Sequence, residues 1–286
     1  MITIDIKQIT TAKLHAYLLS AISPRPIAFA STVDVNGCPN LSPFSFFNVF
    51  SANPPILIFS PARRVRDNTT KHTLENVLEI KEVVINVVNY NIVQQMSLSS
   101  TEYAKDINEF EKAGFTMLPS ELVKPFRVAE SPIQFECKVN EVISLGKEGG
   151  AGNLIICEIL KIHISKKVLD ENEMIDQEKL DLVARAGGSY YSRVKNGFFE
   201  IPKPLTSLGI GIDQIPIKIK NSTVLTGNNL GMLANVEKLP NQQDVDNFAK
   251  DNQQYIGLKM QEKHKFAQEF LENNDVNSAW KVLLIK

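Results

Sequence analysis

The sequence predicts a mainly β fold with helices (α+β), in which a series of short strands closes into an antiparallel β-barrel. Three observations support this class: short β-prone apolar runs recur, turn signals separate them, and few helical patterns lie between them. A barrel of this kind removes the exposed edges of a sheet. The strand pattern weakens near residue 205. We therefore expect a domain at residues 1–204 and a C-terminal extension at residues 205–286, first turn-rich and then helical.

The first strands follow from local turn chemistry. Residues 27–33 (IAFASTV) are apolar and β-prone, and the dipeptide Asn36-Gly37 behind them predicts a tight hairpin that returns near residues 40–42. An Asn-Pro-Pro break then precedes residues 56–60 (ILIFS), an uninterrupted apolar run. Such a run predicts a core strand that is covered on both faces.

A helix and further strands come next. Thr73 is the predicted N-cap of a helix over residues 74–81, which leads directly into a strand at residues 83–88 (VVINVV). Residues 91–113 have the polar pattern of one or two helices.

Two longer patterns complete the chain. Residues 133–139 and 154–164 predict the two strands of a long antiparallel hairpin. The segment 225–231 (LTGNNLG) has the composition of a turn-rich loop, whereas residues 242–284 have a helical pattern. Apolar side chains recur there at helical spacing, which predicts a packing surface against the barrel or a partner subunit rather than a cofactor site. They are Met260, His264, Phe266, Ala267, Phe270 and Leu271.

Composition excludes several classes of protein. With 31 Lys and Arg against 32 Asp and Glu, the net charge of −1 gives no general footprint for nucleic acid or an anionic membrane. The 3 cysteines (Cys38, Cys137 and Cys157) are too scattered for a disulfide framework. No signal-peptide pattern and no apolar run of roughly 18 residues is present. We therefore expect a cytoplasmic protein with neither a membrane nor a nucleic-acid partner.

The window of residues 60–77 (SPARRVRDNTTKHTLENV) is the candidate anion site. It joins a buried strand to a helix start, where free backbone N–H groups favour anions. Hydroxyl and cationic side chains gather in it: Ser60, Arg63, Arg64, Arg66, Lys71 and Thr73. These donors suit a phosphate monoester. A solvated basic loop with an ordinary helix cap is the alternative, and the window alone leaves both interpretations open.

Three motifs in order carry a family resemblance. SPRPIAFAST (23–32), LSPFSFFNVFSANPPILIFSP (41–61) and KHTLENV (71–77) resemble the flavin reductase-like branch of the FMN-binding split-barrel proteins. The resemblance extends over about residues 10–200. It implies a split β-barrel that holds the isoalloxazine ring of FMN against the first two motifs and the phosphate after the ILIFS strand.

The resemblance also implies site residues. Ser31 and Thr32 should face the ring edge, with Ser45, Phe46 and Asn48 beside it, and Ser60, Arg66, Lys71 and Thr73 should lie near the phosphate. RAGGSYYSR (185–193) resembles a later family segment near the flavin, where Gly187 and Gly188 would allow a close approach of the backbone. Read alone, this pair of glycines is simply a turn. His72 receives no role because the family often has Asp at that position.

The function that the resemblance implies is NAD(P)H:flavin oxidoreduction, in which a transiently bound NADH or NADPH passes hydride to flavin N5. This chemistry needs no side-chain nucleophile, so no catalytic residue is identified. Electrons would continue to a partner oxygenase, free flavin, ferric iron or oxygen. The alternatives are an FMN-dependent electron carrier without NAD(P)H turnover and, more remotely, a scaffold without cofactor.

Two further expectations concern assembly and metals. Because split-barrel relatives generally place flavin near a subunit interface, a homodimer is expected. No metal site is expected, since the 4 histidines are dispersed and no paired-cysteine pattern is present.

Overall fold

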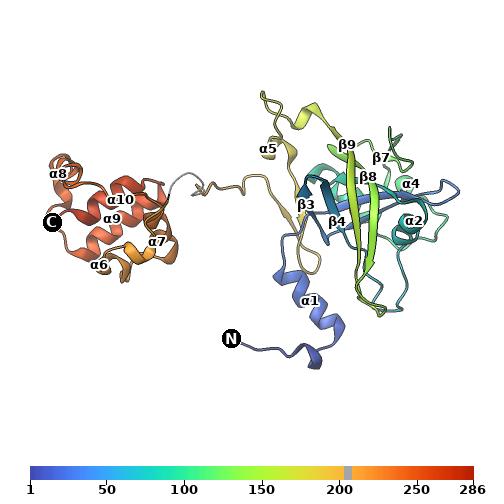
Figure 1. Ribbon diagram of the computed structural model, residues 1–286, viewed down its shortest axis with the longest axis horizontal. Helices are drawn as coiled ribbons and strands as arrows, with labels where there is room; N and C mark the ends of the chain where they lie inside the picture. Colours follow the sequence, from blue (N-terminus) through green and yellow to red (C-terminus); the bar gives the residue numbers. More distant parts are fainter. Residues whose placement is uncertain (203–207) are drawn as a thin grey trace. The chain divides into compact units, whose positions relative to one another are not determined.

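Seven antiparallel strands in the order β2-β1-β5-β8-β9-β4-β3 form the framework of the N-terminal part of the chain (Figure 1). The computed structural model describes residues 1–202 and 208–286. They fall into two units, Met1–Phe198 and Phe199–Lys286, and the sheet belongs to the first. The predicted boundary at residues 204 and 205 lies outside the described residues.

The predicted strands and helices of the first unit are present. The strands of the sheet are β1 (Ala28–Val33), β2 (Pro39–Phe44), β3 (Phe47–Ala52), β4 (Pro55–Phe59), β5 (Glu82–Val87), β8 (Ile133–Ser144) and β9 (Asn153–Ile164). Two small sheets pair β6 (Met117–Leu118) with β7 (Arg127–Val128) and β10 (Val183–Arg185) with β11 (Tyr191–Arg193). The helices are α1 (Thr11–Ala21), α2 (His72–Ile80), α3 (Val93–Leu98), α4 (Glu109–Ala113) and α5 (Gln177–Leu180).

The two predicted hairpins are confirmed. Strands β1 and β2 are joined by a turn in which the Gly37 N–H donates to the Asp34 carbonyl at 3.0 Å and Gly37 has φ of 82°, a backbone angle that favours glycine. Strands β8 and β9 are longer than predicted, with 12 residues each. Their pairing runs from Ile133–Ile164 to Ser144–Asn153.

The barrel is split rather than fully paired. Strands β2 and β3 occupy the two ends of the strand order, and only Ser45 and Phe46 separate them in the chain. The expectation that closure would remove sheet edges is therefore wrong for β3, where Val49 and Phe50 are 62% and 63% exposed.

Strand β1 is buried on both faces because two apolar clusters use its alternate side chains. Ala28 and Ala30 pack inside the barrel with Phe59 of β4. Phe29 packs on the other face of the sheet with Met96 and residues of α4. In β4 itself Leu57 and Phe59 are buried, but the intervening isoleucines are only half-buried, so this strand is not covered on both faces as predicted.

The start of α2 differs from the prediction. The N-cap is Lys71, without a side-chain cap, and Thr73 lies inside the helix. The Thr73 hydroxyl instead accepts a hydrogen bond from the Asn40 amide at 2.9 Å. Thr73 is 1% exposed, so its side chain is committed to the core side of the helix.

The second unit is helical and has its own core. It contains α6 (Ile217–Lys220), α7 (Gly227–Ala234), α8 (Gln242–Asp251), α9 (Met260–Glu272) and α10 (Val276–Leu284). The predicted apolar stripe lies on α9, where Ala267 and Leu271 pack around Trp280 of α10. The stripe is thus packing surface, as expected, but Ala267 and Leu271 pack in the core of their own unit, and the expected packing against the barrel or a partner subunit stays a prediction.

The turn-rich loop predicted at residues 225–231 is wrong, because α7 begins there. Thr226 and Asn229 form a capping box: the Asn229 N–H donates to the Thr226 hydroxyl and the Thr226 N–H donates to the Asn229 side chain. Leu233 of the same helix is fully buried. Capping and burial together outweigh the two glycines in the segment.

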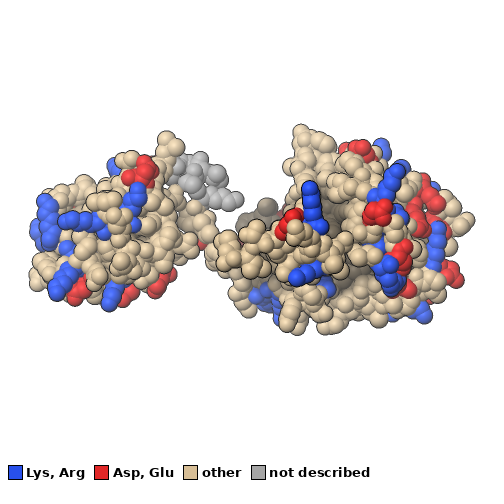
Figure 2. Space-filling model, turned by 90° about the horizontal axis from the view of Figure 1, so that it is seen from below, with Lys and Arg blue, Asp and Glu red and all other residues tan. Residues whose placement is uncertain are grey.

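Charge is spread over the surface. On the face of the N-terminal unit seen in Figure 2, Lys and Arg side chains are interspersed with Asp and Glu side chains. Within residues 1–202 and 208–286, no helix combines the length and the apolar character needed to cross a membrane.

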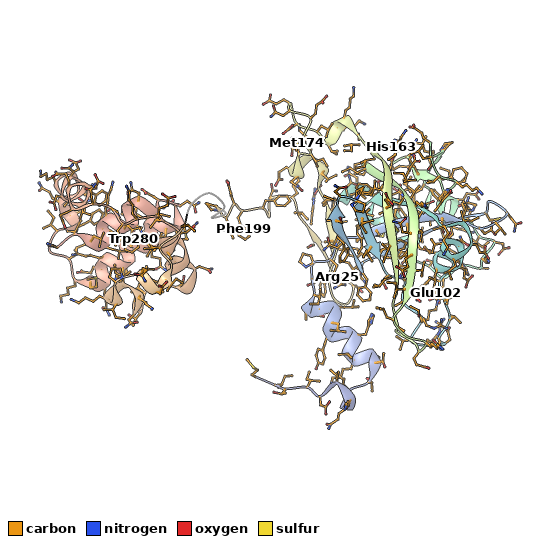
Figure 3. The ribbon with its side chains drawn as sticks, in the orientation of Figure 1. Arg25, Glu102, His163, Met174, Phe199 and Trp280 are labelled. Carbon is orange, nitrogen blue, oxygen red and sulfur yellow. The ribbon has the colours of Figure 1, made fainter. Side chains whose placement is uncertain are left out.

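Glu136 of β8 is a fully buried carboxylate with several donors. It accepts from the backbone N–H groups of Glu121 and Leu122 at 2.9 and 2.6 Å, and His163 Nε2 lies 2.7 Å away (Figure 3). Burial alone raises the pKa of Glu136, but these donors outweigh it, so the pKa is lowered.

A Glu136→Gln variant should therefore lose about 1.5–3 kcal/mol of unfolding free energy at pH 7, the value of hydrogen bonds to a charged group. The lowered pKa means that this contribution is complete above the ordinary carboxyl pKa of 4.5 and is lost as the pH falls through the lower pKa of the folded state. Urea denaturation followed by far-UV circular dichroism measures the unfolding free energy. The difference in this free energy between the variant and the wild type should shrink as the pH is lowered.

Glu130→Gln is the control, because the Glu130 carboxylate also accepts a backbone N–H, that of Thr116 at 3.1 Å, but is exposed. It should change stability by at most about 0.5 kcal/mol. Equal stability of wild type and Glu136→Gln at pH 7 would contradict the assigned role.

Candidate functional site

Two adjoining cavities follow β2 from its end to its start. The larger, which we call the ring-side cavity, has a volume of about 220 Å³ and is lined by Ile27, Pro43, Phe44, Ser45, Met96, Ser97, Ser100, Arg185 and Tyr191. The narrower, the phosphate-side cavity, is lined by Asn40, Ser42, Arg64, Lys71, His72, Ser100, Thr101, Glu102, Tyr103 and Glu109. Ser100 lines both, so the two cavities are neighbours.

Arg25 fixes the wall of the ring-side cavity. Its Nε–H lies 3.4 Å from the Ser45 hydroxyl, and its remaining donors reach the carbonyls of Leu19, Ile22 and Ala186. Arg25 is 6% exposed and lies between the end of α1 and the sheet (Figure 3). It joins three segments around the end of β2: the end of α1, the β2–β3 turn and the segment at Ala186.

Three cations converge on one carboxylate at the phosphate-side cavity. Glu102 accepts from Arg64 Nε at 2.8 Å and from Arg66 at 3.0 Å, and Lys71 Nζ lies 3.6 Å away (Figure 3). The Arg64 side chain is 17% exposed, whereas that of Arg66 is 72% exposed. Arg64 is also fixed by the Thr69 hydroxyl at 2.8 Å and the Thr70 carbonyl. The geometry brings three cationic side chains together around one carboxylate.

The pKa shifts describe the same electrostatics. Burial, followed by the charge of Arg64, lowers the pKa of Lys71. Hydrogen bonds from Arg64 and then Arg66 lower the pKa of Glu102. The negative charge of Glu102 is therefore favoured between the three cations. Without a negative charge there, Arg64, Arg66 and Lys71 would repel one another.

A buried polar cluster lies behind the phosphate-side cavity. Asn40 donates to the hydroxyls of Thr32 and Thr73 at 3.2 and 2.9 Å, and Asn76 of α2 donates to Thr32 at 3.1 Å. These contacts join β1, β2 and α2. The hydroxyl oxygen of Ser31, also on β1, is buried without a hydrogen-bond partner among the described residues.

The residues predicted from the sequence are only partly brought together. Ser45 lines the ring-side cavity and Lys71 lines the phosphate-side cavity. Ser31 and Thr32 are completely buried in the protein. Their proposed contact with the ring edge stays a prediction.

The predicted residues Phe46, Asn48 and Ser60 differ in exposure. Phe46 is 38% exposed and packs edge-on against His15, with ring centroids 6.3 Å apart. Asn48 is exposed, and its side chain accepts from the Val49 N–H at 2.8 Å. Ser60 is 8% exposed and donates its N–H to the Phe46 carbonyl at 2.8 Å.

Structural packing accounts for Gly187. A Cβ at this position would lie 2.2 Å from the Ser20 hydroxyl of α1, so the absence of a side chain allows the loop to pack on the helix. Gly188 has φ of 58°, a turn conformation that suits glycine. Contact of either glycine with a ligand stays a prediction.

Several residues that line the two cavities have no distinguishing signal in the sequence. Arg64 was one of several cations in the basic window, and its position next to Lys71 depends on the fold. Arg185 opens the RAGGSYYSR segment, where the glycines drew attention instead. Ser97 lies in α3 and Ser100 lies just after it. Nothing in the local sequence pattern distinguishes these two serines from surface serines.

Comparisons with known proteins identify the family and the fold of residues 20–183. The family model described as flavin reductase like domain matches residues 20–183. An uncharacterized protein of Aquifex aeolicus (strain VF5) is 38% identical over 186 residues, covering 65% of this chain and 92% of the relative.

Two crystal structures have the same fold. Nitrilotriacetate monooxygenase component B from Bacillus cereus has a TM-score of 0.66 and 28% identity, covering 70% of this chain and 98% of that protein. A protein of Shewanella frigidimarina NCIMB 400 with a split barrel domain has a TM-score of 0.59 and 26% identity, covering 69% and 96%.

Proposed function

The chain belongs to the flavin reductase like domain family, and we propose that its split barrel binds FMN and passes hydride to it from a transiently bound NADH or NADPH. The observation that carries the proposal is the pair of neighbouring cavities along β2, of which one is lined by cationic side chains and the other by several hydroxyl groups. FMN has the matching chemistry, because a phosphate and a flat ring with polar edges lie at its opposite ends.

The cationic end fits a phosphate monoester. Arg64 and Lys71 line this cavity, and their convergence with Arg66 on Glu102 indicates a point where negative charge is stabilised. Arginine and lysine donors pair well with phosphate oxygens. Of the cations in the basic window, we assign the principal phosphate contacts to Arg64 and Lys71, with Arg66 nearer solvent.

The other end fits the ring. Apolar groups of Ile27, Phe44 and Met96 offer packing surface, while Ser45 and Arg185 offer hydrogen-bond donors to polar ring atoms. The bound flavin would supply the two-electron chemistry. The chain's residues would orient the ring, exclude water from its buried edge and place donors where charge develops.

The electron acceptor follows from the family by analogy. The similar Bacillus cereus protein is component B of a monooxygenase, so we propose a partner oxygenase as one acceptor, alongside free flavin, ferric iron or oxygen. An FMN-dependent electron carrier without NAD(P)H turnover remains the second candidate, because the same flavin contacts serve both functions.

A homodimer is part of the proposal. Strand β3 is an end strand with exposed Val49 and Phe50, and β9 carries Leu160 and Ile162, which are 44% and 50% exposed. Exposed apolar side chains next to an unpaired sheet edge favour association.

Val49→Lys should therefore shift the FMN-loaded chain from dimer to monomer at micromolar concentration, because it would bury a charge in the interface. Multi-angle light scattering measures the mass directly. Val35→Lys at the β1–β2 turn, where Val35 is 68% exposed, is the control and should leave the dimer intact. A monomeric wild type that binds FMN fully would overturn the dimer.

Arg64→Ala and Lys71→Ala should each raise the dissociation constant of FMN by roughly ten- to more than a hundredfold, since charge-assisted contacts are typically worth about 1.5–3 kcal/mol. Riboflavin, which lacks the phosphate, should scarcely respond. Flavin fluorescence quenching titrations measure both ligands.

Two variants sharpen this test. Arg66→Ala should cost less than Arg64→Ala, because the Arg66 side chain is 72% exposed. Glu102→Gln should strengthen FMN binding by removing the carboxylate that competes for the same cations. Equal losses for FMN and riboflavin in Arg64→Ala and Lys71→Ala would show that the window supports the ring or the fold.

Anaerobic titration of the FMN-loaded chain with NADH and with NADPH separates reductase from carrier. Bleaching of the flavin absorbance within seconds to minutes is expected with at least one nucleotide. An unchanged spectrum, with full bleaching by dithionite, would instead favour the carrier. Nicotinamide binding should be weak without flavin, as the family domain offers no dinucleotide fold to hold the pyrophosphate.

A further inference from the structure

The small β10–β11 hairpin presents two arginines in matching surroundings. Arg185 stacks over the Tyr191 ring at 4.6 Å from its centroid, and Arg193 stacks over Tyr90 at 3.8 Å. Arg185 pairs with Tyr191 in the hairpin, and Arg193 pairs with Val183. Each guanidinium thus lies over an aromatic ring, a favourable contact for a cation.

The two arginines differ in charge compensation. Arg193 donates to both carboxylate oxygens of Asp181, at 2.8 and 2.6 Å, so its charge is paired. Arg185 donates to the Tyr190 carbonyl at 3.0 Å. In the described part of the chain no carboxylate oxygen lies within the 4.0 Å ion-pair distance of Arg185.

A second uncompensated cation reinforces the first. Arg25 is buried, it is held by backbone carbonyls, and likewise no carboxylate of the described residues pairs with it. Burial and the nearby charge of Arg185 both lower the pKa of Arg25, as expected for two like charges that lack a counter-ion. The Ala186 carbonyl that accepts from Arg25 directly follows Arg185 in the chain.

This unpaired charge faces the ring-side cavity, which Arg185 lines together with Ser45, Ser97, Ser100 and Tyr191. A partly buried charge without a counter-ion is costly, and a ligand that carries or acquires negative charge in the cavity recovers that cost. The same cavity wall contains no acidic side chain.

We propose that Arg185 stabilises the negative charge that the flavin ring acquires on reduction, and so raises the reduction potential of the bound flavin. The proposal rests on flavin binding in this site. Hydride brings two electrons and one proton to N5 of the neutral oxidised ring, and the nicotinamide is oxidised. Without uptake of a second proton, the ring keeps one negative charge, delocalised over N1 and the C2 carbonyl oxygen.

Arg185→Gln tests the proposal, and the double variant Arg193→Gln/Asp181→Asn, which removes the ion pair of the same hairpin, is the matched control. Removal of the Arg185 charge should weaken binding of reduced FMN by about ten- to a hundredfold relative to oxidised FMN. This lowers the two-electron midpoint potential by about 30–60 mV, since a tenfold change corresponds to 29.6 mV. Spectrophotometric titration with dithionite and a reference dye measures the potential.

The comparison variants have distinct expected results. The double variant Arg193→Gln/Asp181→Asn should shift the potential by less than about 10 mV, because it removes one positive and one negative charge together and leaves the net charge unchanged. Arg185→Lys keeps the charge and should retain most of the wild-type potential. Riboflavin should show the same shift as FMN in Arg185→Gln, which separates this effect from the phosphate contacts.

The pH dependence of the wild-type potential gives a test that needs no variant. If the reduced ring stays anionic, one proton enters per two electrons and the slope is about 30 mV per pH unit; a neutral reduced ring gives about 59 mV. The proposal expects the lower slope in wild type near pH 7. A slope of about 59 mV there would overturn it.

The outcomes also separate this proposal from the function it rests on. Failure of the wild-type chain to bind either FMN or riboflavin would overturn both. Normal flavin binding, with equal potentials for wild type and Arg185→Gln, would overturn the role of Arg185 alone.

Discussion

The buried guanidinium of Arg25 is the constraint on which the site geometry depends. Its donors are satisfied by carbonyls at the C-terminal end of α1, where the helix dipole favours a cation, and by the Ala186 carbonyl. A buried arginine is expensive unless its N–H groups are paired, so these segments are held to fixed positions. Ser45, at the turn between β2 and β3, lies next to the same group. The ring-side cavity is therefore bounded by residues far apart in sequence that one side chain brings together.

The two cavities differ in how the charge of their cationic side chains is compensated. At the phosphate side, Glu102 neutralises cations that would otherwise repel one another. At the ring side, no such carboxylate is present among the lining residues. The phosphate-side cavity thus contains the carboxylate of Glu102, whereas the positive charge of Arg185 at the ring-side cavity is available to a ligand bound there.

Much of the barrel was predictable because its signals are local. The Asn-Gly turn, the β-prone runs and the long β8–β9 hairpin each follow from a few neighbouring residues. Local sequence predicts Thr73 as a helix cap, but its hydroxyl bonds to Asn40, which comes from β2 and is distant in the chain. In the same way, sequence shows that several arginines cluster near residue 64 but not which of them the fold buries. The two glycines in residues 225–231 favour a loop in a local reading. The helix that forms there depends on a capping box, which requires a particular geometry of the Thr226 and Asn229 side chains.

The position of Trp280 affects how this protein can be observed. It is the 1 tryptophan of the chain, it is 1% exposed, and its indole N–H donates to the Leu233 carbonyl at 2.9 Å within the helical unit (Figure 3). Its emission therefore reports the packing of the C-terminal helices around it. A bound flavin would provide the complementary optical signal. With the two chromophores in different units, tryptophan emission and flavin absorbance together would resolve the order in which the two cores melt.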